Sequence, residues 1–252
     1  MKISVKNFFI PENTVTAVTK EDYSKVENII NATNAFARST YRCVYIIDYY
    51  QQNFLYISPN MALLLGKSRE EIMDFGYRIY TDLVPEEDLK MLLEINQKGF
   101  LKLNEFPSND KVKYSISYDF RFVNGRKRRM VNHRITPILL DRNGNVWLAL
   151  CTIALSSSRV AGNIILQKDE ESAYWSYNLK SHRWEFCKGI VLSDTEKDVL
   201  VMSAQGIKME EIASTLCKSV DTIKACKRVL FSKFHVGNIS EAIAYASNYR
   251  LL

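Results

Sequence analysis

Alternating apolar and polar residues mark the clearest strand of the chain. Its two faces differ, because four apolar side chains alternate with four polar ones. The apolar positions are Ile116, Tyr118, Phe120 and Phe122, and the polar ones are Ser115, Ser117, Asp119 and Arg121. The pair Asn124-Gly125 has the composition of a tight hairpin turn, and a second turn at 141–144 precedes the apolar run Val146–Leu155. This pattern predicts antiparallel strands joined by short turns.

Two shorter apolar runs, Val44–Ile47 and Phe54–Ile57, predict a hairpin upstream of these strands. Three short helices are expected after that hairpin. Their predicted limits are Ser58 to Gly66, a start at Ser68 with Glu71 completing a capping box, and Pro85 to Gly99. Together these elements predict an α+β domain over residues 41–155, with one antiparallel sheet and helices on one of its faces.

The segments on either side of this domain are less regular. Residues 1–40 carry a weak helical pattern, and residues 156–190 begin with three serines and include a charged stretch. Within 156–190, further strands are expected at Asn163–Leu166, Ala173–Tyr177 and Arg183–Phe186. We therefore expect an N-terminal helical segment over 1–40 and a structured connector over 156–190.

Residues 191–252 have the apolar spacing of four short helices. The predicted elements are Ser193 to Gly206, with Glu196 completing a capping box, then Met209–Leu216, Ser219 to about Phe234, and a helix from Asn238. The second and third of these helices are joined by a tight turn. Such a pair within a four-helix unit predicts a helix-turn-helix architecture.

The third predicted helix has one apolar face and one polar, mostly basic face. Its apolar residues, spaced three or four apart, are Ile223, Cys226, Leu230 and Phe234. The opposite face carries Asp221, Lys224, Ala225, Arg228 and Ser232, while Lys227 and Lys233 flank the apolar face. Between positions 218 and 233, five basic residues stand against one acid. A Lys and an Arg one turn apart, beside a small Ala, can reach guanine N7 and O6 in a major groove.

The other polar residues of this segment are expected at the DNA backbone. Phosphates are predicted to meet the helix N-terminus and its flanking side chains, namely Lys218, Ser219, Thr222, Lys227 and Lys233. Asp221 is expected either to read cytosine N4 or to exclude wrong sites. The alternative interpretation is that Lys224 and Arg228 only solvate a surface helix.

Composition is that of an ordinary globular protein, with 252 residues of which 47% are hydrophobic and 25% charged. The longest apolar stretch, Val146–Leu155, is too short for a membrane helix, and no signal-peptide pattern is present, so a cytoplasmic protein is expected. Five cysteines without a C-x-x-C pair and three scattered histidines predict free thiols and no metal site. The net charge is +6, but residues 191–252 hold 8 basic and 7 acidic residues, so DNA binding must rest on local clustering.

The predicted α+β domain resembles a PAS domain. The resemblance covers residues 41–155 and rests on YISPN (Tyr56–Asn60), LLGKSREEI (Leu64–Ile72) and LVPEEDL (Leu83–Leu89), which occur in the order typical of that family. PAS domains are sensory or dimerising modules, and some hold a ligand behind the sheet. The resemblance therefore implies signal sensing or dimerisation.

The motifs of two PAS cofactors are missing. The flavin-adduct type carries a cysteine in a G-x-N-C-R-F motif, which does not occur here, and the haem type supplies a histidine from a helix, whereas residues 1–132 contain no histidine. No cofactor is therefore predicted. An unidentified small apolar or aromatic ligand, a protein partner, and a core filled by side chains all stay open.

The C-terminal segment resembles the LuxR-type helix-turn-helix domain from Leu192 to Ala242 without a gap. The matching positions are Leu192-Ser193, Glu196, Val199-Leu200, Gly206, Glu211-Ile212-Ala213, Leu216, Ser219, Thr222-Ile223-Lys224, Lys233-Phe234 and Glu241-Ala242. The resemblance implies a bacterial transcription factor that binds double-stranded DNA as a homodimer and works with RNA polymerase. It places base contacts at Lys224, Ala225 and Arg228, and dimer contacts on the fourth helix at Ala242, Ile243 and Ala246. The family often has His where this chain has Cys226.

A second basic cluster occupies the predicted hairpin of the α+β domain. It contains six positive charges and no acid, at Arg121, Arg126, Lys127, Arg128, Arg129 and Arg134. The cluster is either a site for nucleic acid or another polyanion, or a charged hairpin tip that protects a strand edge from pairing.

We therefore expect a sequence-specific DNA-binding regulator with a PAS-like domain over 41–155 and a LuxR-type domain over 191–252. A different class of function, in which the PAS-like domain docks a partner protein and DNA binding is secondary, stays open. Nucleophile–base pairs, paired carboxylates and phosphate-binding glycine loops are missing from the sequence, so no enzyme is predicted.

Overall fold

The computed structural model describes residues 3–16, 18–249 and 251. The predicted segments 1–40 and 191–252 therefore each include a few positions outside the described residues. The chain divides into two compact units, the first made of residues 1–155 with 160–187 and the second of residues 156–159 with 188–252. In the described part of the chain, no helix has both the length and the apolar character needed to cross a membrane.

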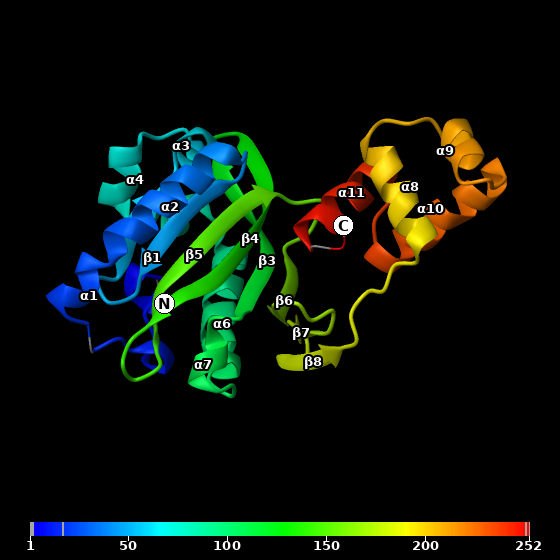
Figure 1. Cartoon of the computed structure of the whole chain (residues 1–252). Coiled ribbons are helices and arrows are strands. Elements are labelled where there is room, and N and C mark those ends of the chain that lie inside the picture. The colour runs from blue at the N-terminus through cyan, green and yellow to red at the C-terminus, as the bar shows by residue number, and fades with distance from the viewer. Residues whose placement is uncertain (1–2, 17, 250, 252) are drawn as a thin grey trace. The chain divides into compact units, whose positions relative to one another are not determined.

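The first unit is built on an antiparallel sheet of eight strands (Figure 1). The order across the sheet is β2-β1-β5-β4-β3-β6-β7-β8. The strands are β1 (Cys43–Asp48), β2 (Asn53–Ile57), β3 (Tyr114–Asn124), β4 (Lys127–Leu140), β5 (Val146–Leu155), β6 (Gly162–Lys168), β7 (Tyr174–Asn178) and β8 (Arg183–Cys187). The first five strands form the 2-1-5-4-3 sheet of a PAS-like domain, so the predicted α+β fold class is confirmed.

The last three strands of this sheet come from the segment that the sequence analysis assigns to a connector. β6 pairs with β3, β7 with β6, and β8 with β7. Tyr177 and His182 both reach the carboxylate of Glu94 on α6 (Glu86–Leu103), at 2.6 and 2.5 Å. The three strands therefore extend the sheet of the first unit and are held to its longest helix.

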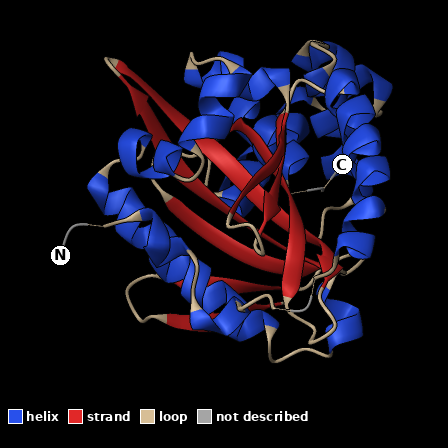
Figure 2. Ribbon diagram, turned by 90° about the vertical axis from the view of Figure 1, so that its left-hand side faces the viewer, coloured by secondary structure: helices blue, strands red, loops and turns tan. Residues whose placement is uncertain are grey.

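Helices cover both faces of the sheet, although the sequence analysis expects them on one (Figure 2). On one face lie α3 (Pro59–Leu65), α4 (Arg69–Phe75), α5 (Arg78–Leu83), α6 and α7 (Ser108–Lys111), with the short 3-10 helices Val5–Phe8 and Pro11–Asn13. On the other face lie α1 (Lys20–Ser24) and α2 (Val26–Ser39).

The reason for this difference lies in β1. Val44 and Ile46 point to one face and Tyr45 and Ile47 to the other, and all four are buried. A strand with apolar residues on both sides needs a cover on both sides, and the apolar side of α2 supplies the second cover with Val26 and Ala37 among others.

Polar residues of the PAS-like motif stabilise the connection between β2 and α3. The Ser58 hydroxyl accepts a hydrogen bond from the backbone N–H of Val44 at 2.8 Å and has no exposed surface. Asn60 donates to the carbonyl oxygens of Thr40 and Arg42, at 3.1 Å each. These two side chains bond to backbone groups at the start of β1 and just before it. They thereby hold the start of α3 against β1.

One helix limit of the sequence analysis is wrong. Gly99 does not end a helix, because α6 continues to Leu103. A Cβ at position 99 would lie 3.1 Å from Cδ1 of Ile116 on β3, so the missing side chain lets the helix approach the sheet. Gly99 is a packing residue here, and the helix ends four residues later, where Asn104 follows Leu103.

The second unit consists of four helices, as the apolar spacing predicts. They are α8 (Asp194–Ala204), α9 (Met209–Thr215), α10 (Val220–Phe234) and α11 (Ile239–Asn248). Ser193 caps α8, with Ser193 N donating to Glu196 at 2.7 Å and Glu196 N donating to Ser193 Oγ at 3.3 Å. The core is apolar and comes from all four helices and from Leu192, which precedes α8. Its helical residues are Val199, Leu200, Ile212, Ala213, Ile223, Leu230, Phe234, Ala242 and Ala246.

Candidate nucleic-acid interface

The turn between α9 and α10 has the geometry of a helix-turn-helix. Cys217 adopts a left-handed backbone conformation with φ of 51°, and the backbone N–H of Lys218 returns to the carbonyl of Ala213 at 2.8 Å. Ser219 then caps α10, because its hydroxyl accepts from the backbone N–H of Thr222 at 3.1 Å. The two helices are thereby joined by three residues, Leu216, Cys217 and Lys218, between the end of α9 and the cap of α10.

One face of α10 is buried and the other is exposed. Ile223, Leu230 and Phe234 have almost no exposed surface, and Cys226 is half-buried beside them. The exposed residues of the helix and its cap include Lys218, Ser219, Asp221, Thr222, Lys224, Ala225, Arg228 and Ser232, whereas Lys227 is half-buried. The side chains predicted for DNA contact are therefore brought together on the solvent side of one helix, with Lys233 as the exception.

Lys233 is engaged inside the domain. Its Nζ lies 2.7 Å from the carboxylate of Glu196 on α8, and it also donates to the carbonyl of Val191 at 3.0 Å. Glu196 is only 6% exposed. The ammonium group that the sequence analysis assigns to phosphates thus compensates a nearly buried carboxylate, which the spacing within α10 could not reveal.

The two charged residues at the start of α10 form a pair of their own. Nζ of Lys224 lies 3.1 Å from a carboxylate oxygen of Asp221, and both side chains are exposed. Arg228 has no such partner among the described residues. An exposed pair of this kind has little effect on stability, so its members can exchange partners readily, whereas Arg228 makes no ion pair with any residue that the structure describes.

Sequence reasoning missed one residue of this face. Val229 is 46% exposed, next to Arg228 and four residues after Ala225. An exposed apolar side chain beside a small one suits contact with a thymine methyl group. Helical spacing from Ala225 was the signal that could have identified it.

The proposed dimer contacts need correction. Ala242 and Ala246 of α11 have no exposed surface and pack in the core of their own domain. They cannot touch a second copy while this core is intact. Ile243 is half-buried and packs against the same core. Alanine at the first two positions is explained by close helix packing, which the sequence alone does not distinguish from an interface.

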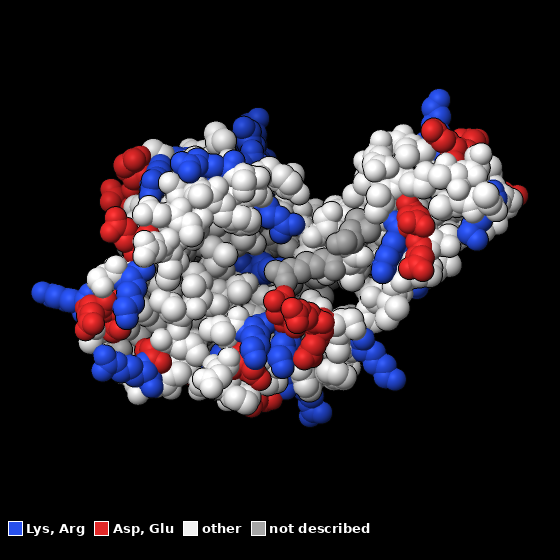
Figure 3. All heavy atoms as spheres, in the orientation of Figure 1, with Lys and Arg blue, Asp and Glu red and all other residues white. Residues whose placement is uncertain are grey.

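Charge over the visible surface of the second unit is mixed (Figure 3). Basic and acidic side chains alternate there, in agreement with the near balance of the sequence over residues 191–252. Local geometry on α10, rather than overall charge, therefore defines the candidate interface.

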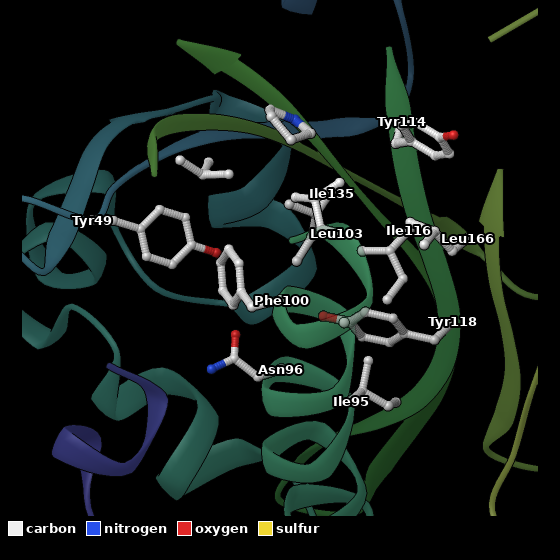
Figure 4. A pocket seen from close by; sticks show the side chains of 13 residues that line it. Tyr49, Ile95, Asn96, Phe100, Leu103, Tyr114, Ile116, Tyr118, Ile135 and Leu166 are labelled. Carbon is white, nitrogen blue, oxygen red and sulfur yellow. The ribbon is translucent and has the colours of Figure 1, made fainter. Parts of the chain in front are cut away.

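A second candidate site is a pocket in the first unit, between α6 and the sheet (Figure 4). Its empty space is roughly 500 Å³, including the open mouth. Most of its wall is apolar, from Ile95, Gly99, Phe100, Leu103, Ile116, Ile135, Pro137, Val146 and Leu166. Such a lining fits an apolar or aromatic molecule.

Three polar groups interrupt this apolar wall. Tyr49, Asn96 and Tyr118 point their polar ends toward the pocket (Figure 4). Neither tyrosine hydroxyl has a hydrogen-bond partner in the described part of the chain, whereas Asn96 uses its amide N–H to bind the carbonyl of Phe8 at 2.7 Å. Burial raises the pKa of both tyrosines well above the ordinary value, so both stay neutral.

Beside this pocket lies a buried polar cluster that the sequence analysis did not predict. Nε2 of His133 lies 2.5 Å from the Tyr45 hydroxyl, which also bonds to Tyr80. Burial lowers the pKa of His133 to about 3, so its ring is neutral. Nδ1 of the same ring is buried and has no partner within the described residues.

No group of three or more His, Cys, Asp or Glu residues within the described ranges has the arrangement to hold a metal ion. The five cysteines are free thiols, and burial raises the pKa of the Cys226 thiol above its ordinary value.

Comparison with known proteins gives the class of the second unit. Residues 190–246 match the model of the family described as bacterial regulatory proteins, luxR family. This region is a LuxR-type helix-turn-helix domain, the DNA-binding domain of a family of transcriptional regulators, as the sequence predicts. No curated protein matches the chain at a significant level.

Solved structures were also compared over the whole chain. One is a phage VqmA–DPO complex, 16% identical, with 92% of this chain and 94% of that chain covered and a TM-score of 0.34. Another is the Vibrio cholerae VqmA dimer in the absence of target DNA, 17% identical, with 92% and 88% covered and a TM-score of 0.31.

Proposed function

We propose that this chain is a sequence-specific transcriptional regulator whose α10 enters the major groove. The observation that carries the proposal is the position of Arg228 on the solvent face of α10 in a LuxR-type domain, where it is exposed and has no ion pair among the described residues. Lys224 and Ala225 lie on the same face, within one turn. We assign base contacts to these three residues, with the Arg228 guanidinium donating to guanine N7 and O6.

Phosphate contacts belong to the residues around this face. Lys218, Lys227, Ser232 and the N-terminal turn at Ser219 and Thr222 are the groups we assign to the backbone. Lys233 is excluded from this set, because its ammonium group holds Glu196. Two copies of the chain would meet two half-sites one helical turn apart, and the homodimer is part of the proposal.

The experiment selects bound duplexes from a random library with the full chain and then measures affinity for the selected site. Arg228→Ala is expected to weaken that affinity by about 1–3 kcal/mol and to relax preference at one base pair. Lys227→Ala, the matched control, is expected to weaken all sequences alike. Unchanged affinity in both Lys224→Ala and Arg228→Ala would contradict the assignment of α10.

We also propose that the first unit senses a small, neutral, mainly apolar molecule in the pocket beneath α6. The apolar wall supports this. The hydroxyls of Tyr49 and Tyr118 have no partner among the described residues, so they offer one or two hydrogen bonds to a polar group of the ligand. A charged ligand is disfavoured, because the pocket lining contains no ionised side chain to compensate its charge.

A native mass spectrum of the purified chain tests this second part. Mass in excess of 29.1 kDa per protomer is expected, and it should disappear in Gly99→Leu, whose new side chain would fill the space between α6 and β3. Leu101→Met, on the exposed side of α6, is the control. The sensing role would be contradicted if the wild-type protomer carried no excess mass either before or after incubation with a cell extract.

A further inference from the structure

The tip of the β3–β4 hairpin extends beyond the sheet that supports it. Pairing of β4 with β5 begins only at Val131, and pairing of β3 with β6 ends at Asp119. Residues 120–130 therefore form a two-stranded ribbon without a further strand on either side, although Phe120 and Phe122 stay buried. Figure 2 shows this ribbon projecting from one corner of the first unit, past the surrounding helices.

Two members of the basic cluster do not belong to the free tip. Arg121 is bound by Asp88, with Nε at 2.9 Å from one carboxylate oxygen, and it also contacts Glu87. Arg134 is nearly buried and donates to the hydroxyl of Ser115 at 2.9 Å. The cluster that reaches solvent is thus smaller than the sequence predicts, and it is concentrated at the turn.

The cations at the turn itself can bind an anionic ligand. Arg126, Lys127 and Arg128 are exposed, and their side chains make no ion pair or hydrogen bond with any other residue that the structure describes. Arg129 donates to the carbonyl of Leu64, which holds the base of the ribbon against α3. Successive strand residues point to opposite faces, so the tip carries positive charge on both faces.

A neighbouring loop adds a further positive charge. The Asn124 side chain donates to the carbonyl of Leu65 at 2.6 Å, so the loop after α3 lies against the ribbon. Lys67 in that loop stands over the ring of Phe75, with Nζ 4.5 Å from the ring centre. In Figure 3, Lys and Arg side chains gather along the upper margin of the first unit, where this corner lies in Figure 1.

We propose that this tip is a second nucleic-acid contact of the chain, one that binds the phosphate backbone without reading bases. Narrow two-stranded ribbons fit the grooves of a duplex, and unpaired Lys and Arg are the usual phosphate ligands. The sequence Asn124–Arg129 contains no apolar side chain, so it has no anchor for a protein core or for insertion into a lipid surface.

The inference rests on the proposed function, because a DNA-bound helix-turn-helix domain holds the tip at high effective concentration near the same duplex. The ligand is the DNA that flanks the selected site. The tip would lengthen the protected region and add salt-dependent affinity without changing sequence preference. Protection of a strand edge, the other interpretation of the cluster, does not require any of these effects.

The experiment compares the full chain with Arg126→Ala/Lys127→Ala/Arg128→Ala on a duplex that carries the selected site between flanks of two helical turns. The slope of log affinity against log salt is expected to fall by about 0.9 for each lost phosphate contact, and by no more than about 2.7. Preference for the selected site over a scrambled one should not change. Hydroxyl-radical protection of the flanks should disappear in the variant.

A charge-matched control is Lys20→Ala/Lys25→Ala/Arg142→Ala, whose three side chains are exposed. Arg142 follows the far end of β4, a full strand length from the tip. The control is expected to keep the wild-type slope. The inference would be overturned if the wild-type chain, the tip variant and the control had equal slopes of log affinity against log salt. It would also be overturned if the tip variant kept its DNA affinity and lost only binding to anionic phosphatidylserine vesicles.

Failure of the proposed function is a separate outcome. In that case the wild-type chain would bind selected and scrambled duplexes equally well. Arg228→Ala would leave the affinity unchanged. The inference on the tip fails independently, when Arg228→Ala loses preference as expected but the tip variant keeps its slope and its flank protection.

Discussion

The carboxylate of Glu196 lies 2.7 Å from Nζ of Lys233, and this pair joins the first turn of α8 to the last turn of α10. Burial of the Glu196 carboxyl raises its pKa, but hydrogen bonds from Lys233 and from the backbone of Ser193 outweigh burial, and the pKa lies below the ordinary value. One cation of α10 therefore links this helix to α8 within the domain.

The first prediction is that Lys233→Met destabilises the second unit. The variant leaves a nearly buried carboxylate without its partner, which costs about 1–3 kcal/mol. Because the pKa of Glu196 is lower in the folded state, the pair stabilises at neutral pH, and this stabilisation decreases as pH falls below the ordinary carboxyl pKa. Urea unfolding at pH 7 and pH 4 measures both effects.

Lys227→Met is the control for this prediction, since Lys227 has no ion pair among the described residues of the domain. It should unfold close to the wild-type midpoint at both pH values. If Lys233→Met and Lys227→Met had equal stabilities, the Glu196 pair would be only a surface contact.

The second prediction concerns Asp221→Asn. This change removes the negative charge that holds Lys224 at 3.1 Å and that would face DNA phosphates. Affinity for scrambled duplexes is expected to rise severalfold, with a smaller ratio between selected and scrambled sites. Asp198→Asn, an equal charge change on the exposed side of α8, is the control. Loss of affinity for the selected site alone would instead identify Asp221 as a reader of cytosine.

Local rules predicted the helix starts well. The capping boxes at Ser68 and Ser193 both form with the expected partners, because each depends only on residues three positions apart. The strand with alternating residues and the helices of the second unit are confirmed for the same reason. Periodicity and caps are local properties, and they need no knowledge of the tertiary contacts.

Tertiary contacts account for what the sequence did not predict. Lys233 and Glu196 are 37 positions apart, and Gly99 and Ile116 meet only when α6 lies on β3. Small or charged residues at such positions serve packing, yet the sequence analysis assigned them to a helix end or to DNA. The same applies to Ala246 on α11, a helix that packs against α8 and α10.

The third prediction compares two glycines of the first unit. Gly99→Ala places a Cβ near the flexible end of Ile116 but improves helix propensity by about 1 kcal/mol, so the net change should stay within about 1 kcal/mol. Gly144→Ala is expected to cost more than Gly99→Ala. Gly144 has φ of 78°, and a Cβ there would lie 2.5 Å from Oγ of Ser108.

Thermal unfolding of the two variants measures this difference. The order of the two unfolding midpoints tests the prediction, because both substitutions add the same methyl group to the same unit. If Gly99→Ala were the less stable variant, α6 would have no freedom to accommodate the contact with β3, and the pocket between them would be more rigid than its open lining implies.

The fourth prediction is that stability of the first unit falls as pH decreases from 7 toward 4, through His133. Burial lowers the pKa of His133 to about 3 in the folded chain, whereas an unfolded histidine takes up a proton near pH 6.5. Protons therefore bind to the unfolded state first, and stability decreases by about 1.4 kcal/mol per pH unit between those two values.

Two variants separate this titration from the loss of a hydrogen bond. His133→Phe removes the titrating group, so its stability should depend less on pH, whereas Tyr45→Phe removes the hydroxyl that binds Nε2 at 2.5 Å but keeps the ring that titrates. Each should be less stable than the wild-type chain at pH 7, by about 1 kcal/mol for each lost hydrogen bond. Tyr45→Phe loses two such bonds, because its hydroxyl also bonds to Tyr80. Urea unfolding at three pH values distinguishes them. A pH dependence that survives in His133→Phe would mean that carboxylates, and not this buried ring, set the acid sensitivity of the unit.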